Sequence, residues 1–286
     1  MPNKEETIKG GLRELSKDNR DFSLTKVFGS MYISDIPDID FMVSDKFYIK
    51  DQKNSDICVA AACSAVSEDQ EGVMLSMEWF FSQIKKMEGD YRSWGADIRS
   101  GMKTGVKVGF MEKVFAEYSL SDGRDFIANY ENWNKALFPK ALSHKKKSYF
   151  AVDGPYDFFN NCRANLWLHR EDKASIVTGV LWQRGWINAK DGIIDFEGVP
   201  AFGHALKICG QKKIKDKWYL VAQLSNGTSI GDKGFFYFSQ EIINKHFTFG
   251  AYMYKDMPPE DAKKVAWNFW RKLLEKIRQI LNTKIC

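Results

Sequence analysis

Cysteine and histidine are scarce in this chain, and their spacing excludes several classes of site. The 286 residues include five cysteines and four histidines. No C-x-x-C pair or Cys/His cluster has the spacing of a zinc site, so we expect no metal and no cofactor. The cysteines are sparse and odd in number, which is unlike a secreted disulfide framework. We therefore expect a protein of the cytoplasm or another reducing compartment.

Long apolar runs and clustered charge are also missing. The sequence begins with the polar residues Met1–Glu6, and no apolar run approaches transmembrane length. We expect neither a signal peptide nor a transmembrane segment. The net charge of +5 is spread along the chain, and Lys145–Lys147 is the one basic run. Such a short run is more typical of a solvated loop, so no nucleic-acid partner is expected.

The pattern of the chain predicts an α+β protein. Helices are expected from Cys58 onward, over Leu75–Met87 with Ser76 as N-cap, and over Ala96–Lys103, ending near Gly105. Composition changes near residue 148, and four β-rich runs follow: Ser175–Trp182, Ala205–Cys209, Trp218–Ala222 and Gly234–Phe238. Gly210–Lys213 and Asn226–Gly227 are expected to be turns between them. Helices followed by antiparallel strands make an α+β order.

Four parts are predicted along the chain. They are an N-terminal arm over 1–32, a helical lobe over 33–147, a β-rich lobe over 148–256 and a C-terminal amphipathic helix over 257–286. The last part carries an apolar stripe from Val265 to Ile280. We expect this helix to pack on the body of the protein, with docking to a partner or an anionic surface as the alternative.

Gln52 and Cys58 carry the first indication of chemistry. A helix that begins at Cys58 would place its thiol at free N–H groups and at the positive end of the helix dipole, which lowers a thiol pKa. The amide of Gln52, six residues upstream, could fold back beside the sulfur. An acyl-transfer cysteine enzyme needs these two parts and also a base.

Histidine is the expected base, and His204 is the best candidate. It opens the β-run Gly203–Ile208, which could hold its ring rigidly. His144, His169 and His246 lie in polar stretches and are expected to be surface or loop residues.

Several motifs in order resemble those of the papain-like cysteine peptidases, from about Ile36 to Phe238. They are Asp51-Gln52 to Cys58, Leu75-Ser76, Ala96–Arg99 with Gly105-Val106, Gly203-His204-Ala205, and Gly227–Phe235. The resemblance implies a two-lobe fold, with a helical N-terminal lobe, an antiparallel β-barrel-like C-terminal lobe and the active-site cleft between them. It also implies that Cys58 is the nucleophile and His204 its base. The Gln52 amide and the Cys58 N–H would form the oxyanion hole, and Ala205 with Phe202 would flank an apolar substrate pocket, although Phe202 could be core instead.

Three positions, Leu224, Asn226 and Val59, depart from the family pattern. Leu224 stands where the family has the asparagine that orients the histidine, and Asn226 stands two residues further on. Asn226 could reach His204 if the strand end shifts by two residues, because i and i+2 share a face. The alternatives are that Gln223 substitutes, or that Asn226–Gly227 is only a turn. Val59 replaces the aromatic residue that follows the nucleophile, and the residues before Ile33 are too few for the family's usual folded pro-domain.

The sequence therefore predicts a thiol protease of the peptidase C1 type that hydrolyses peptide or protein substrates through a Cys58 thioester, with amidase or transpeptidase activity also open. Such an enzyme could be intracellular or virus-encoded, the latter allowing a place in the virion. The alternative is a papain-fold protein of weak or lost activity that serves in binding or assembly. Cys63, on the same helix as Cys58, is expected to be a small buried residue.

Overall fold

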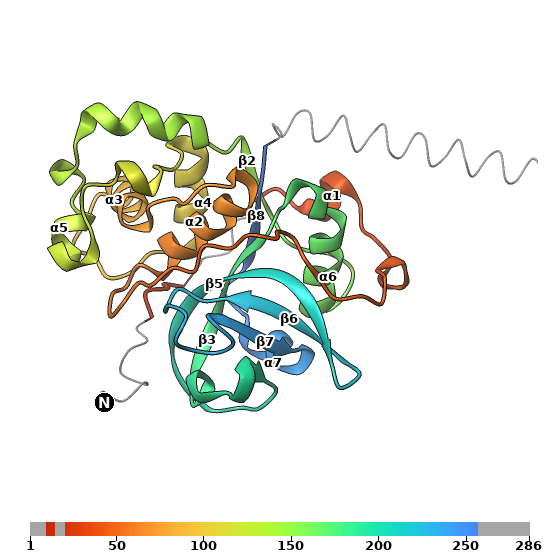
Figure 1. The fold of residues 1–286 in the computed structure, drawn as a ribbon. Helices are drawn as coiled ribbons and strands as arrows, with labels where there is room; N and C mark the ends of the chain where they lie inside the picture. The colour runs from red at the N-terminus through yellow and green to blue at the C-terminus, as the bar shows by residue number, and fades with distance from the viewer. Residues whose placement is uncertain (1–9, 15–20, 257–286) are drawn as a thin grey trace, which may run out of the picture.

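A computed structural model of the protein describes residues 10–14 and 21–256 (Figure 1). The α-helices are α1 (Leu24–Phe28), α2 (Cys58–Glu71), α3 (Met77–Glu88), α4 (Ile98–Lys107), α5 (Arg124–Ala128), α6 (Phe158–Leu168) and α7 (Gln240–His246). The strands are β1 (Phe41–Met42), β2 (Ser148–Ala151), β3 (Ile176–Arg184), β4 (Ile193–Ile194), β5 (Val199–Ile214), β6 (Lys217–Gln223), β7 (Phe235–Ser239) and β8 (Ala251–Lys255). A longer 3-10 helix, η6, covers Lys135–His144, and shorter ones join the other elements.

Capping residues mark the ends of the helices in the first half of the chain. Alanines fill the first turns of α2, and its C-cap Gly72 adopts the left-handed conformation (φ 73°). Ser76 caps α3, as predicted, and accepts a hydrogen bond from the Trp79 N–H at 3.1 Å. Asp97 caps α4, which begins at Ile98, two residues after the predicted start, and ends at Lys107, two residues after Gly105.

The strands form one mainly antiparallel sheet in the order β2-β8-β3-β5-β6-β7-β4, and β1 pairs with β5 off this path. Only the β4–β7 pair among these ladders is parallel. Within the described residues β2 and β4, at the two ends of the order, do not pair with each other, so the sheet is curved but not closed. The α+β class is confirmed, with β5 at the centre of the sheet.

The predicted turn at Gly210–Lys213 is wrong. These residues continue β5, and the chain reverses at Lys215 and Asp216, whose φ angles are +48° and +64°. Two residues with positive φ between Ile214 and Lys217 make a tight hairpin connection. Gly210 lies instead at a register shift in the β5–β6 ladder, where a glycine typically marks a bulge.

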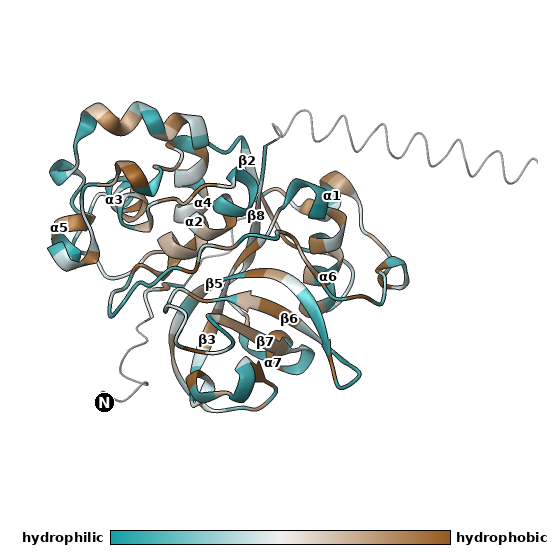
Figure 2. Ribbon diagram, in the orientation of Figure 1, coloured by the Kyte–Doolittle hydropathy of each residue, from teal (hydrophilic) through white to brown (hydrophobic). Residues whose placement is uncertain are grey.

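Two apolar cores meet at the junction of α2 and β5. One fills the sheet, with Trp182, Trp186 and Phe236 among its largest members. The other lies among α2, α3 and α4 and includes Cys58 together with Ala205 of β5. Figure 2 shows apolar residues along the inner strands and on the helices, while the hairpin and loop ends are hydrophilic.

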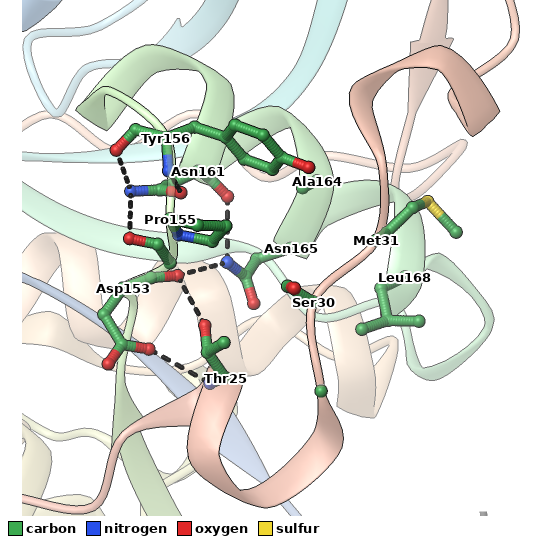
Figure 3. A pocket seen from close by; sticks show the side chains of 12 residues that line it. Thr25, Ser30, Met31, Asp153, Pro155, Tyr156, Asn161, Ala164, Asn165 and Leu168 are labelled. Carbon is green, nitrogen blue, oxygen red and sulfur yellow. Dashed lines mark hydrogen bonds between the residues drawn. The ribbon is translucent and has the colours of Figure 1, made fainter. Parts of the chain in front are cut away.

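The described part of the N-terminal arm is fixed to the body beside α6. Thr25 donates through its N–H to the Asp153 carboxylate at 3.0 Å and through its hydroxyl to the Asp153 carbonyl at 2.9 Å. Asn165 donates to the same carbonyl at 3.2 Å, and Asn161 ties the loop to α6 (Figure 3). The shallow pocket at this place is therefore the packing seam of α1.

The predicted helix over 257–286 lies outside the described residues. None of the helices in the described ranges is long and apolar enough to cross a membrane.

A buried ion pair joins α2 to β5. Lys207 Nζ lies 2.9 Å from Asp69 Oδ1, and both side chains are 1% exposed. Asp69 also accepts a hydrogen bond from the Ser175 hydroxyl at the start of β3. Burial raises the pKa of Asp69, because the charged carboxylate loses water that Lys207 and Ser175 replace only in part.

We expect Lys207→Met to destabilise the protein by about 3–5 kcal/mol, since it leaves the Asp69 carboxyl buried without its cation. The double variant Asp69→Leu/Lys207→Met should recover much of this loss. Urea unfolding followed by circular dichroism measures both. Lys213→Met, on the same strand but in an exposed pair with Asp38, is the matched control and should unfold like the wild type. An equal loss in the control would contradict the special role of the buried pair.

Candidate functional site

Cys58 is the first residue of α2 and is completely buried. The backbone N–H of Ala205 points at its sulfur, with 3.4 Å between the nitrogen and Sγ. That nitrogen belongs to the peptide bond that joins His204 to Ala205. The structure therefore brings the Cys58 sulfur beside the backbone of the predicted base, although the two residues lie far apart in the sequence.

His204 lies within β5 rather than at its start, because the strand begins at Val199. It pairs with Val180 of β3 and is completely buried. The indole of Trp182 lies 5.8 Å from the imidazole, centroid to centroid, and the ring of Phe202 lies 6.4 Å away. Trp182 was not among the residues that the sequence analysis selected.

Gln52 is held in place by the turn that follows β6. Its backbone N–H donates to the Ser225 carbonyl at 2.6 Å, and its side-chain Oε1 accepts from the Ser225 hydroxyl at 2.5 Å. Its Nε2 donates to the Ser55 carbonyl at 2.7 Å. The side-chain amide of Gln52, six residues before Cys58, is thus fixed in orientation by hydrogen bonds to Ser225 and Ser55.

Asn226 does not hold the His204 ring by a hydrogen bond. Its two side-chain polar atoms are buried and make no hydrogen bond with any described residue, and its backbone bridges to Asp51. Gln223 is engaged elsewhere, since its Nε2 donates to the Tyr48 carbonyl at 2.8 Å. Leu224 is buried and lines a small pocket with Ala205 and Leu206. The two candidate orienters, Asn226 and Gln223, therefore give His204 no side-chain hydrogen bond, and Leu224 between them has no side-chain amide.

The remaining histidines are held in local networks away from Cys58. His169 lies in the turn after α6 and His246 is the last residue of α7, and both are buried rather than on the surface. Burial, assisted by the nearby Lys255 cation, lowers the pKa of His169 to about 3. His246 pairs with Gln183, and His144 lies between Glu71 and Glu112.

Residues Gly10–Glu14, which we call the covering segment, pass over the junction beside Cys58. Ala96 donates its N–H to the Gly11 carbonyl at 2.8 Å and accepts from the Arg13 N–H at 3.0 Å. On the other side, the Leu12 N–H donates to the Gly203 carbonyl at 3.3 Å. The segment is therefore bound through its backbone to both the helical and the sheet side of the site.

Glycine is required where the covering segment is closest to the body. A Cβ on Gly11 would lie 1.9 Å from the Asp56 carbonyl oxygen, and a Cβ on Gly95 would lie 2.0 Å from the Gly11 carbonyl oxygen. Leu12 packs over Gly179, where a Cβ would lie 2.2 Å from its side chain. The sequence signal for this contact was the pair Gly10-Gly11 before an apolar residue, which the sequence analysis did not use.

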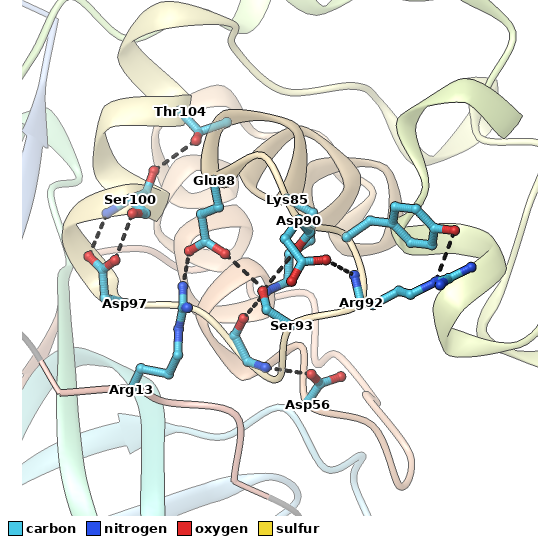
Figure 4. A network of polar contacts seen from close by, with 12 residues as sticks. Arg13, Asp56, Lys85, Glu88, Asp90, Arg92, Ser93, Asp97, Ser100 and Thr104 are labelled. Atoms are coloured by element: carbon cyan, nitrogen blue, oxygen red, sulfur yellow. Dashed lines mark hydrogen bonds and ion pairs between the residues drawn. The ribbon is translucent and has the colours of Figure 1, made fainter.

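A polar network anchors the covering segment at its outer side (Figure 4). Arg13 forms an ion pair with Glu88 at the end of α3, and Glu88 also pairs with Lys85 at 3.0 Å. Asp56, two residues before Cys58, accepts from the Gly95 N–H at 2.5 Å and from Arg124 at 2.8 Å. Burial alone would raise the pKa of Asp56, but Arg124 and the Gly95 N–H outweigh it and hold that pKa below its usual range.

The environment of Cys58 favours the neutral thiol in this covered arrangement. Burial raises the pKa of Cys58 to about 11, although the N–H groups of Ala205 and Gly11 act in the opposite direction. The helix position is thus the one expected of a reactive thiol, while the lack of water around the sulfur keeps it protonated at neutral pH. No group of three potential metal ligands occurs among residues 10–14 and 21–256.

Comparison with solved structures identifies the fold. The structure of xylellain, a cysteine protease from Xylella fastidiosa, matches with a TM-score of 0.70 over 90% of this chain and 99% of that one, at 20% identity. Bromelain from Ananas comosus in complex with E64 matches with a TM-score of 0.56 over 76% and 98%, at 13% identity. The ragweed pollen protease Amb a 11 in its proform gives a TM-score of 0.62 at 15% identity, covering 83% of this chain and 70% of that chain.

The chain therefore has the papain-like cysteine peptidase fold, as the sequence motifs predicted. No protein-family model matches the sequence, and the search of curated proteins finds no match.

We expect Gly11→Val to displace the covering segment, because the added side chain cannot fit against Asp56. Once water reaches the sulfur, the pKa of Cys58 should fall from about 11 toward the ordinary thiol value. At pH 8 the thiolate fraction, and with it the rate of alkylation by iodoacetamide, should rise about 100-fold. Peptide mass spectrometry measures Cys58 against buried Cys63. Glu14→Val, an exposed change in the same segment, is the control, and equal rates in all three proteins would contradict the covering role.

Proposed function

We propose that this chain is a cysteine peptidase that cleaves peptide or protein substrates at Cys58. The observation that carries the proposal is the position of the Cys58 sulfur at the start of α2, 3.4 Å from the nitrogen of the His204–Ala205 peptide bond. A papain-like fold and an immobilised Gln52 amide support it. Cys58, Cys63, Cys162 and Cys209 are free thiols, which agrees with work in a reducing compartment.

In the proposed reaction His204 takes the thiol proton, and the Cys58 sulfur attacks the substrate carbonyl carbon. The oxyanion accepts hydrogen bonds from the Cys58 N–H and the Gln52 amide. As the C–N bond breaks, His204 returns the proton to the leaving amine, and a thioester remains on Cys58. Water then attacks the thioester, His204 takes a proton from it, and the acid product leaves with the thiol restored. Ala205 and Phe202, next to His204, would contact the substrate.

The covering segment must leave before a substrate can reach Cys58 in this proposal. It makes backbone hydrogen bonds to Ala96 and Gly203 on both sides of the sulfur, and Gly11 contacts the loop that leads into α2. The described arrangement is therefore a resting form, whose protonated thiol agrees with its burial.

We expect the Gly11→Val chain to hydrolyse fluorescently labelled casein and to form a 1:1 adduct with E-64 at Cys58. Adding Cys58→Ser or His204→Ala should abolish turnover, because each removes one half of the nucleophile–base pair. Cys63→Ser, on the same helix, should retain it. Casein fluorescence measures the hydrolysis, and intact-protein mass spectrometry measures the E-64 adduct. The proposal fails if Cys58→Ser hydrolyses casein as fast as its parent.

A second function, binding or assembly with weak or lost activity, is favoured by one observation. Asn226 gives no hydrogen bond to His204, and the buried Leu224 stands where an orienting asparagine is expected. On this alternative the Gly11→Val chain would bind unfolded casein in a fluorescence anisotropy assay without cleaving it, and His204→Ala would bind equally well.

A further inference from the structure

An aromatic wall lies against the imidazole of His204. Trp182 on β3 is 3% exposed, and its ring is tilted 65° to the imidazole at a centroid distance of 5.8 Å. Phe202 approaches the same ring from β5, tilted 67° at 6.4 Å. Edge-to-face contacts at these distances are favourable and depend on ring orientation.

The sheet register explains how Trp182 reaches His204. Val180 is the direct cross-strand partner of His204, and Trp182 is the partner of Phe202 two residues away. Trp182 is thus a diagonal cross-strand neighbour of His204 on the same face of the sheet. An indole is large enough to reach across this diagonal distance. The β3–β5 register shifts directly after Trp182, between Trp182 and Gln183. Such an irregularity turns a side chain out of its regular direction.

The indole of Trp182 is itself fixed from the other side. Trp186 packs against it at 5.4 Å and 84°, and Phe236 packs against it at 5.9 Å and 87°. All three rings belong to the core of the sheet. A wall held in this way restricts rotation of the imidazole about its Cβ–Cγ bond, because a different ring angle would lose the contact.

The polar groups expected in this role are engaged elsewhere or do not reach the ring. Gln223 donates to Tyr48, the Asn226 amide makes no hydrogen bond to a described residue, and Leu224 is apolar.

We propose that Trp182 is a positioning residue that sets the ring angle of His204 through edge-to-face packing. The proposal rests on the peptidase function proposed above. It assigns to an apolar side chain a task for which a hydrogen bond is the usual means. Trp182 acts through His204 and takes no part in the bond changes.

The test compares Trp182→Leu and Trp182→Phe in the Gly11→Val chain. Trp182→Leu should lower kcat for casein-derived fluorogenic peptides about tenfold, with a smaller effect on KM, whereas Trp182→Phe should retain most of the activity. The pH dependence of Cys58 alkylation should also change. The lower inflection of this pH profile reports the pH at which the Cys58 thiolate forms beside the His204 imidazolium. In Trp182→Leu, but not in Trp182→Phe, this inflection should rise toward the pKa of an isolated thiol.

Phe238→Leu is the matched control. It removes a fully buried ring that packs on Trp186 and Phe247, and it lies in the same core without a ring contact to His204. If Phe238→Leu changes kcat and the alkylation profile as much as Trp182→Leu does, the effect is general loosening of the core and the inference is overturned. If the Gly11→Val chain has no turnover at all, the peptidase function is overturned and the inference with it.

Discussion

The packing of α2 against β5 is the constraint on which the site depends. Asp69 lies eleven residues after Cys58 on α2, three turns along the same face, and its partner Lys207 lies two residues after Ala205 on the same face of β5. The ion pair at one end and the Ala205–Cys58 contact at the other fix how the helix is placed along the strand. A shift of the helix by a fraction of a turn would both separate a buried charge pair and move the sulfur away from the His204 backbone.

The same junction explains why the thiol is protonated in this arrangement. The start of a fourteen-residue helix and two backbone N–H groups favour a thiolate, whereas complete burial favours the thiol, and burial dominates here. Part of that burial comes from the covering segment, whose Gly11 N–H also faces the sulfur. Burial under the covering segment raises the pKa of the Cys58 thiol, whereas the helix start and the N–H groups lower it. Gly11 and Gly95 have no side chains, so the covering segment can pack directly against the backbone beside Cys58.

Most of the fold could be predicted from the sequence, because it follows from local signals. Ser76 and Gly72 determine where helices begin and end, and the β-rich runs after residue 148 form the sheet. The prediction of a turn at Gly210–Lys213 was wrong because glycine occurs both in turns and at bulges within strands. Pairing with β6 places these four residues in a strand, and the local sequence does not reveal that pairing. The Ser225–Gln52 contact and the place of Trp182 depend on tertiary pairing, for which the chain carries no local pattern. The covering segment has one local signal, the pair Gly10-Gly11, but that pair does not say which part of the protein the segment contacts.

Leu224, an apolar residue where the sequence motifs predict an orienting asparagine, is accompanied by aromatic contacts around His204. An apolar residue there can pack with Ala205 and Leu206 but cannot accept a hydrogen bond from an imidazole. The surroundings of His204 are correspondingly aromatic, with Trp182 and Phe202 within reach of the ring. Dispersion and quadrupole contacts are less directional than a hydrogen bond, so one ring alone would constrain the imidazole weakly. Trp186 and Phe236 pack on the other side of the Trp182 indole, and this second layer limits how far the indole can move with the imidazole.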